Sequence, residues 1–77
     1  MNVSEIVKQE LAQVCAVPVE DIHEDANLVS FGLDSMRTME LIVALDARFN
    51  IRIDEDDIET VATVGDVIRA VERSQKS

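Results

Sequence analysis

The stretch from Asp34 to Phe49 reads DSMRTMELIVALDARF and has the pattern of an amphipathic helix. Asp34 and Ser35 are both residue types that cap helix N-termini, and Asn50 is typical of a C-terminal stop. Apolar side chains recur along the stretch at helical spacing, at Met36, Met39, Leu41, Ile42, Leu45 and Phe49. The stretch therefore predicts a helix over residues 34–49, with a broad apolar face against a core.

The residues before it predict a first helix followed by a long connection. Asn2 and Glu5 have the spacing of a capping box, and Pro18 ends the helix within a few residues. Residues 16–34 then carry apolar side chains at intervals, namely Val19, Ile22, Leu28 and Phe31. We therefore expect a loop that packs its own apolar side chains onto the core, rather than a disordered linker.

The residues after it predict a short helix and a last helix. Residues 51–53 alternate as a strand would, but they have no second strand to pair with, so we expect an extended link. The acidic residues 54–57 favour a helix start, because carboxylates stabilise a helix N-terminus. Thr63 and Asp66 form a second capping-box pattern, and the apolar stripe after them continues to about Ser74. The sequence thus predicts an all-α bundle of three main helices and one short helix, with a long first loop.

Length and charge restrict the possible functions. The 77 residues suffice for a single domain, residues 1–77, and 7 basic against 16 acidic side chains give a formal net charge of −9. So acidic a chain is not expected to bind nucleic acid. The longest apolar run, Leu41–Leu45, is too short to span a bilayer, and no apolar signal region follows the N-terminus. We expect a cytoplasmic monomer with basic protein surfaces as partners.

No constellation of catalytic residues is visible. His23 is the only histidine, and no nucleophile elbow, phosphate loop or dinucleotide fingerprint accompanies it. The single Cys15 can form neither an internal disulfide nor a metal cluster, and we expect it to be buried as packing. The acidic cluster at residues 54–59 lacks the glycine and the spaced glutamate of a calcium-binding EF-hand loop. We therefore expect neither an enzyme nor a metal site.

The segment Phe31-Gly32-Leu33-Asp34-Ser35-Met36 places a serine at the start of the central helix. One interpretation is that Ser35 is only an N-cap, and the residue types alone favour it. The other is that its hydroxyl carries a phosphate ester, because the N–H groups and the dipole at a helix N-terminus favour an anion.

Four groups of residues decide between these interpretations. They are GLDSM at 32–36, ELI at 40–42 with AL at 44–45, Phe49 with Ile51 and Ile53, and TVGDVI at 63–68. In these residues the chain resembles the acyl carrier protein family over nearly its whole length. The resemblance implies an acyl-carrier-like four-helix bundle that carries cargo as a thioester on a 4′-phosphopantetheine arm.

The resemblance also implies roles for single residues. Ser35 is the expected attachment site, and Asp34 and Met36 adjoin it where a phosphopantetheinyl transferase would recognise the chain. The further partners implied are an acyl-loading ligase or acyltransferase, and a ketosynthase or condensation-type enzyme. The expected docking positions are Arg37, Glu40, Asp46, Asp54 and Asp57.

Three residues depart from the family pattern. Arg37 stands where many fatty-acid carriers have an acid, and Ala47 and Arg48 dilute the acidity near the end of the same helix. Because a basic residue weakens docking to a basic partner, we expect a specialised carrier in fatty-acid-like, polyketide or modified-lipid assembly. The alternatives are a discrete aminoacyl or peptidyl carrier of a nonribosomal-peptide-type pathway, or an acidic helical adaptor in which Ser35 is only an N-cap.

Overall fold

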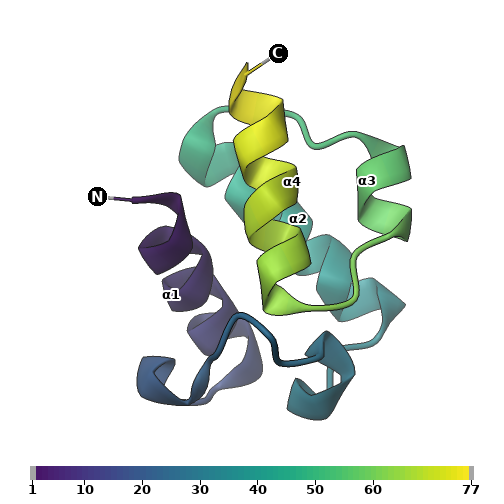
Figure 1. Cartoon of the computed structure of the whole chain (residues 1–77). Coiled ribbons are helices and arrows are strands. Elements are labelled where there is room, and N and C mark those ends of the chain that lie inside the picture. The colour runs from purple at the N-terminus through teal and green to yellow at the C-terminus, as the bar shows by residue number, and fades with distance from the viewer. Residues whose placement is uncertain (1, 77) are drawn as a thin grey trace.

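The computed structural model describes residues 2–76 and contains four α-helices (Figure 1). They are α1 (Val3–Cys15), α2 (Ser35–Phe49), α3 (Glu55–Glu59) and α4 (Val64–Lys76), with the 3-10 turns η1 (Val19–Asp21) and η2 (Leu28–Phe31) between α1 and α2. The described residues form no strand, only one antiparallel bridge between Asn27 and Thr63. The all-α prediction of three main helices and one short helix is confirmed. No helix in this part of the chain combines the length and the apolar character that crossing a membrane requires.

The helices begin and end close to the predicted capping residues. Asn2 Oδ1 accepts a hydrogen bond from the Glu5 N–H at 2.8 Å, and α1 ends at Ala16 in the left-handed conformation (φ 56°). Asn50 ends α2 in the same conformation (φ 54°). The last helix runs to Lys76, slightly beyond the predicted end near residue 74.

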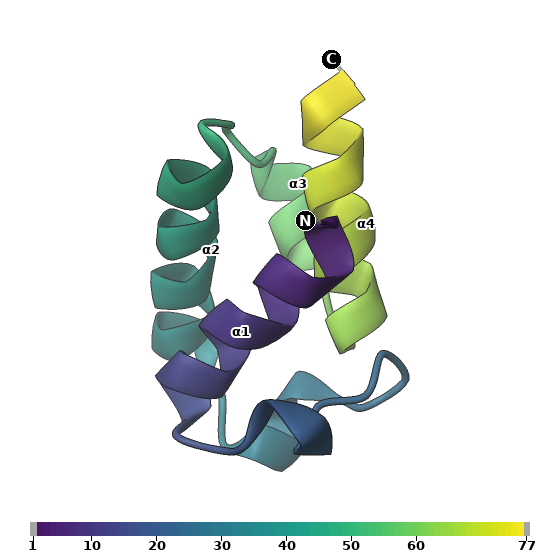
Figure 2. The ribbon, with the colours of Figure 1, turned by 90° about the vertical axis from the view of Figure 1, so that its left-hand side faces the viewer.

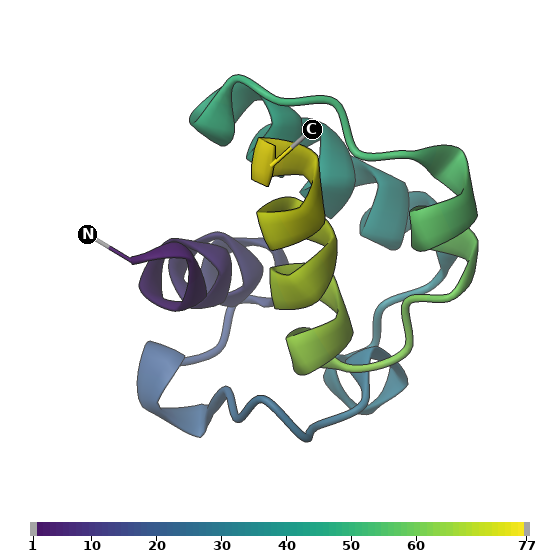
Figure 3. The same ribbon diagram turned by 45° about the horizontal axis from the view of Figure 1, so that its top comes forward.

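Helices α1, α2 and α4 enclose the core, and α3 lies beside α4 on the side away from α1 (Figures 1 and 3). In the view turned by 90°, α1 crosses in front of α2 and α4 (Figure 2). Two ion pairs join the helices. Arg48 of α2 bonds to Glu10 of α1 at 2.6 Å, and Arg73 of α4 bonds to Asp57 of α3 at 3.0 Å.

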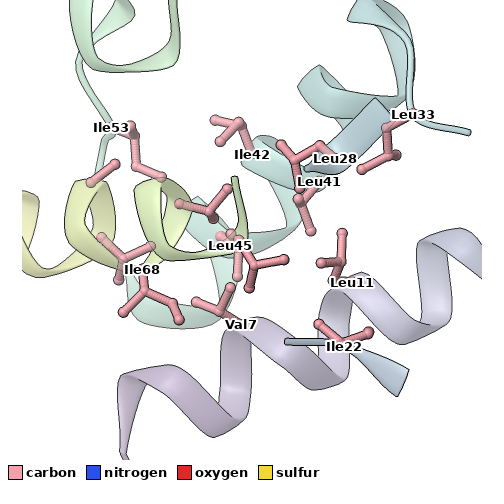
Figure 4. Close-up of a cluster of buried hydrophobic side chains, with 14 residues drawn as sticks. Val7, Leu11, Ile22, Leu28, Leu33, Leu41, Ile42, Leu45, Ile53 and Ile68 are labelled. Carbon is pink, nitrogen blue, oxygen red and sulfur yellow. The ribbon is translucent and has the colours of Figure 1, made fainter. Parts of the chain in front are cut away.

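The core consists of 14 buried apolar side chains from helices and loops alike (Figure 4). Ile22, Leu28 and Leu33 of the long first connection belong to it, so the prediction of an ordered loop is confirmed. Helix α3 contributes no fully buried residue and packs against the core through half-buried Ile58. Among the four α-helices, α3 therefore has the smallest apolar anchorage.

Two apolar side chains that the patterns of the helix and the loop placed against the core are instead exposed, and for them the prediction was wrong. They are Met39, which is 46% exposed, and Val19, which is 40% exposed. Met36 is 73% exposed, as its expected contact with a partner requires. Nine residues, or two and a half helical turns, separate Met36 from fully buried Leu45, so the two lie on opposite sides of α2. Val19 lies in a surface turn in which Ile22 takes the core position.

The long connection is fastened to the start of α4. Backbone hydrogen bonds join Leu28 N–H to the Ala62 carbonyl at 2.9 Å and Gly65 N–H to the Glu24 carbonyl at 2.8 Å. A side chain at residue 65 would approach that Glu24 oxygen at 3.2 Å, which explains the glycine. The connection that leads to α2 is thereby held in place by α4.

A reciprocal capping box fixes the same corner. The Asp66 carboxylate accepts hydrogen bonds from the N–H groups of Ala62 at 2.9 Å and Thr63 at 3.0 Å, and Thr63 Oγ1 accepts one from the Asp66 N–H at 3.2 Å. The two backbone hydrogen bonds, with help from Arg69, lower the pKa of Asp66 to about 2.

We predict that Asp66→Asn lowers the free energy of unfolding near neutral pH by about 1 kcal/mol, because it weakens charge-assisted hydrogen bonds. The folded-state pKa is depressed, so this contribution is present above the ordinary value of 3.8 and is lost as the pH falls towards about 2. Chemical denaturation of wild type and Asp66→Asn between pH 7 and pH 2 measures it, with exposed Asp21→Asn as control. A difference that stays constant down to the lowest pH would contradict the assignment.

Candidate functional site at the start of α2

A glycine sets the turn before α2. Gly32 follows η2 with φ 82°, a left-handed conformation that glycine adopts without steric cost. Its N–H donates to the Val29 carbonyl at 3.0 Å. The next side chain, Leu33, is only 5% exposed and anchors the chain in the core. These two residues fix the point at which the chain enters α2.

Asp34, and not Ser35, caps the helix. Asp34 Oδ1 accepts a hydrogen bond from the Arg37 N–H at 2.8 Å, and the Asp34 carbonyl accepts one from the Thr38 N–H at 2.9 Å. Ser35 is the first residue of α2 and is exposed, and its hydroxyl makes no hydrogen bond within residues 2–76. The interpretation of Ser35 as an N-cap therefore does not match the geometry, since its neighbour fills that role.

The surroundings of the Ser35 hydroxyl suit a phosphate ester. The N–H groups of Ser35 and Met36 belong to the first turn of α2, where backbone donors have no partner in the helix. These donors and the positive end of the helix dipole favour an anion at this position. The Asp34 carboxylate is negative, but it is engaged with the Arg37 N–H. An exposed hydroxyl beside such donors can carry a phosphodiester.

An open groove of about 760 Å³ begins at Ser35. Its walls come from η2, the first turns of α2, α3 and the link from α3 to α4. Apolar side chains dominate these walls, and they are Leu28, Val29, Leu33, Met39, Ile58 and Val61. The polar side chains of the lining are those of Asn27, Asp34, Ser35, Thr38 and Glu59. The groove has the size and the mixed lining that small-molecule sites have.

The outward face of α2 is partly apolar. Met36 and Val43 are 73% and 61% exposed, and Glu40 is exposed between them. Arg37 lies at the edge of this face towards α1, where its Nη1 donates to the Val14 carbonyl at 3.4 Å. Ser35 thus stands where the groove and this outward face meet.

The other acidic docking candidates all make bonds within the fold. The Asp46 Oδ1 accepts from the Ile53 N–H at 3.2 Å and holds the link after α2. Asp54 caps α3 by accepting from the Asp56 N–H at 3.0 Å. Asp57 forms the ion pair between α3 and α4 described above. Glu40 alone among these acids shares the outward face of α2 with the neighbours of Ser35.

Cys15 is part of the packing and not of this site. The side chain is half-buried at the end of α1 and packs against the core. Burial raises the pKa of its thiol above the usual value, although the positive charge of Arg37 acts in the opposite direction. A thiol that stays protonated is a weak nucleophile. Its predicted role as packing agrees with this position, with partial rather than complete burial.

Sequence reasoning missed the groove. Val29, Thr38 and Ile58 were not singled out as site residues, and Met39 was expected only in the apolar face of its helix, yet all four line the groove. The apolar side chains of the first connection could have indicated the groove, because the side chains of such a loop can line a groove as well as fill the core. The position of α3 across the groove from the start of α2 depends on tertiary packing, which no local sequence pattern reports.

Comparison with known proteins identifies the family. Residues 5–71 match the family model described as "Phosphopantetheine attachment site". The chain belongs to the acyl carrier protein family. Its members are carriers and not enzymes, and the carrier bears 4′-phosphopantetheine as its prosthetic group.

Curated relatives and solved structures agree with this. The carrier is 34% identical to the acyl carrier protein of Wolinella succinogenes, over 97% of this chain and 100% of that one, and 31% identical to the acyl carrier protein AcpP of Rhizobium meliloti, over 96% of each. A Mycobacterium tuberculosis protein assigned as an acyl carrier superposes with a TM-score of 0.85, at 28% identity over 92% of this chain and 96% of that one. The acyl carrier protein of Thermotoga maritima (TM-score 0.79, 20% identity, 92% and 84% covered) shares the fold.

We predict that Asp34→Ala lowers the free energy of unfolding by about 1 kcal/mol, because the Arg37 N–H loses its acceptor. Thermal and denaturant unfolding followed by circular dichroism measures this change. Ser35→Ala is the matched variant and is expected to change stability by much less, since its hydroxyl does not cap. Equal losses for the two variants would show that Ser35 contributes to the cap after all.

Proposed function

We propose that Ser35 carries the 4′-phosphopantetheine arm and that the carrier presents acyl intermediates to partner enzymes as thioesters on it. The observation that carries this proposal is that Asp34 and Ser35 have different roles at the start of α2. Asp34 makes the capping bond to the Arg37 N–H, and the exposed Ser35 hydroxyl is left without a partner in the described part of the chain. Thioester formation is the chemistry that the arm supplies when bound.

Several features of the chain support this position for the arm. The first-turn N–H groups of Ser35 and Met36 can stabilise the phosphodiester. The groove that starts at Ser35 offers apolar walls, including those of Met39 and Ile58, to an apolar cargo. Such walls favour an acyl cargo, because its methylene groups leave water when they lie against apolar side chains.

The partners proposed for this carrier follow from the arm. A phosphopantetheinyl transferase attaches it, an acyl-loading ligase or acyltransferase charges it, and a ketosynthase or condensation-type enzyme consumes the cargo. An acidic surface steers such enzymes to the carrier by long-range attraction, while a small interface lets them leave quickly. We place this work in the cytoplasm, because the unpaired Cys15 and a free thiol on the arm both suit a reducing compartment.

We expect wild type to gain one phosphopantetheine group when incubated with coenzyme A and a broad-specificity phosphopantetheinyl transferase, and Ser35→Ala to gain none. Intact mass spectrometry measures the increment. Ser30→Ala is the matched control, because Ser30 is an exposed serine in η2, five residues before Ser35. A group added to Ser35→Ala, or lost in Ser30→Ala, would contradict the proposed attachment site.

We further expect an acyl cargo to occupy the groove and stabilise the carrier. Loading an eight-carbon acyl chain should raise the Tm of wild type by several degrees, because each buried methylene contributes up to about 0.8 kcal/mol. Met39→Glu puts a charge in the groove wall and should abolish most of this increase. Val43→Glu, on α2 but outside the groove lining, should retain it. An increase that is the same in both variants would show that the cargo lies elsewhere.

A further inference from the structure

Arg37 differs from most of the basic side chains because it has no acidic partner among residues 2–76. Within the described residues, four of the other basic side chains form ion pairs with carboxylates, namely Lys8, Arg48, Arg69 and Arg73. Among the described residues, the Arg37 guanidinium makes only the 3.4 Å hydrogen bond to the Val14 carbonyl oxygen, although the chain has a net charge of −9. Arg37 is exposed, so its charge can meet a charge on another molecule.

Arg37 lies in the area of the carrier that a partner enzyme covers. Arg37 lies two residues after Ser35, at the edge of the outward face of α2 that displays Met36 and Val43. A standard interface covers about 800 Å² of each partner, which corresponds to a disc of radius about 16 Å. An enzyme whose active site reaches Ser35 must therefore cover Arg37 as well. Two large exposed apolar side chains in the same area supply the contact that such an interface buries.

We propose that Arg37 is a partner-specificity residue, which selects enzymes that present a carboxylate beside an apolar patch over enzymes that present a basic side chain there. The inference deepens the proposed function and rests on attachment at Ser35. Over the whole carrier, the acidic surface attracts a basic enzyme. At residue 37, however, the same enzyme meets a like charge, and like charges at an interface disfavour that partner.

The experiment measures KM and kcat for transfer of phosphopantetheine to the carrier. Two variants of one transferase are used, with Lys or Glu at the position nearest carrier residue 37 in a crosslinked complex. The carriers are wild type, Arg37→Gln, Arg37→Asp and Arg52→Asp. Arg52 is the matched control, because it is exposed, forms no ion pair within residues 2–76 and lies beyond the far end of α2, about 20 Å from Ser35.

With the Lys transferase we expect Arg37→Asp to have a KM about two- to five-fold below that of wild type, with Arg37→Gln between them and kcat unchanged. With the Glu transferase the order should reverse. Arg52→Asp should change KM little and in the same direction with both transferases, since it alters only the net charge. All carriers should melt alike, because the capping bond uses the backbone N–H of residue 37 and an acid in the first turn is favourable.

Equal effects of Arg37→Asp and Arg52→Asp, or the absence of a reversal between the two transferases, would overturn the specificity role while leaving attachment at Ser35 intact. A wild-type carrier that gains no phosphopantetheine from either transferase, beside a control carrier that does, would overturn the proposed attachment and this inference with it. The mass of the carrier therefore reports a failure of the attachment site, and KM reports a failure of the specificity role.

Discussion

The hydrogen bond from the Arg37 N–H to the Asp34 carboxylate caps α2 at the residue before Ser35, and the rest of the functional site follows from it. Had Ser35 been the cap, its hydroxyl would be turned into the helix end and held there. Because Asp34 satisfies the first-turn donor, Ser35 is the first helical residue and keeps an exposed hydroxyl. One carboxylate thus stabilises the central helix and leaves its neighbour available for modification.

The position of that helix start depends on contacts made far away in the sequence. The first connection is tied to the beginning of α4 by backbone hydrogen bonds at Leu28 and Gly65, and Leu33 is buried in the core. Helix α3 is held more lightly, by half-buried Ile58 and by the ion pair between Asp57 and Arg73. The groove lies between a firmly fixed wall on the η2 side and this lightly held helix, an arrangement that can adapt to cargoes of different size.

Much of the fold could be predicted from the sequence because its signals are local. Capping residues such as Asn2 and Asp34 marked the helix starts, and the spacing of Leu41 and Leu45 marked the buried face. The exposure of Met39 was not predicted, because the apolar residues of this helix were counted without placing each one on a face. Proximity in space could not be predicted, and for that reason the groove and the internal bonds of Asp46 and Asp57 emerged only from the structure.

The central claim is that the phosphodiester forms on Ser35 and on no other residue. Fragmentation of the modified wild-type chain in a mass spectrometer tests it directly, because the fragment ions that bracket a single residue show where the added mass lies. The account predicts that the mass of 4′-phosphopantetheine appears between the fragments ending at Asp34 and at Ser35. The same mass located at Ser30, or at any other residue, would contradict it.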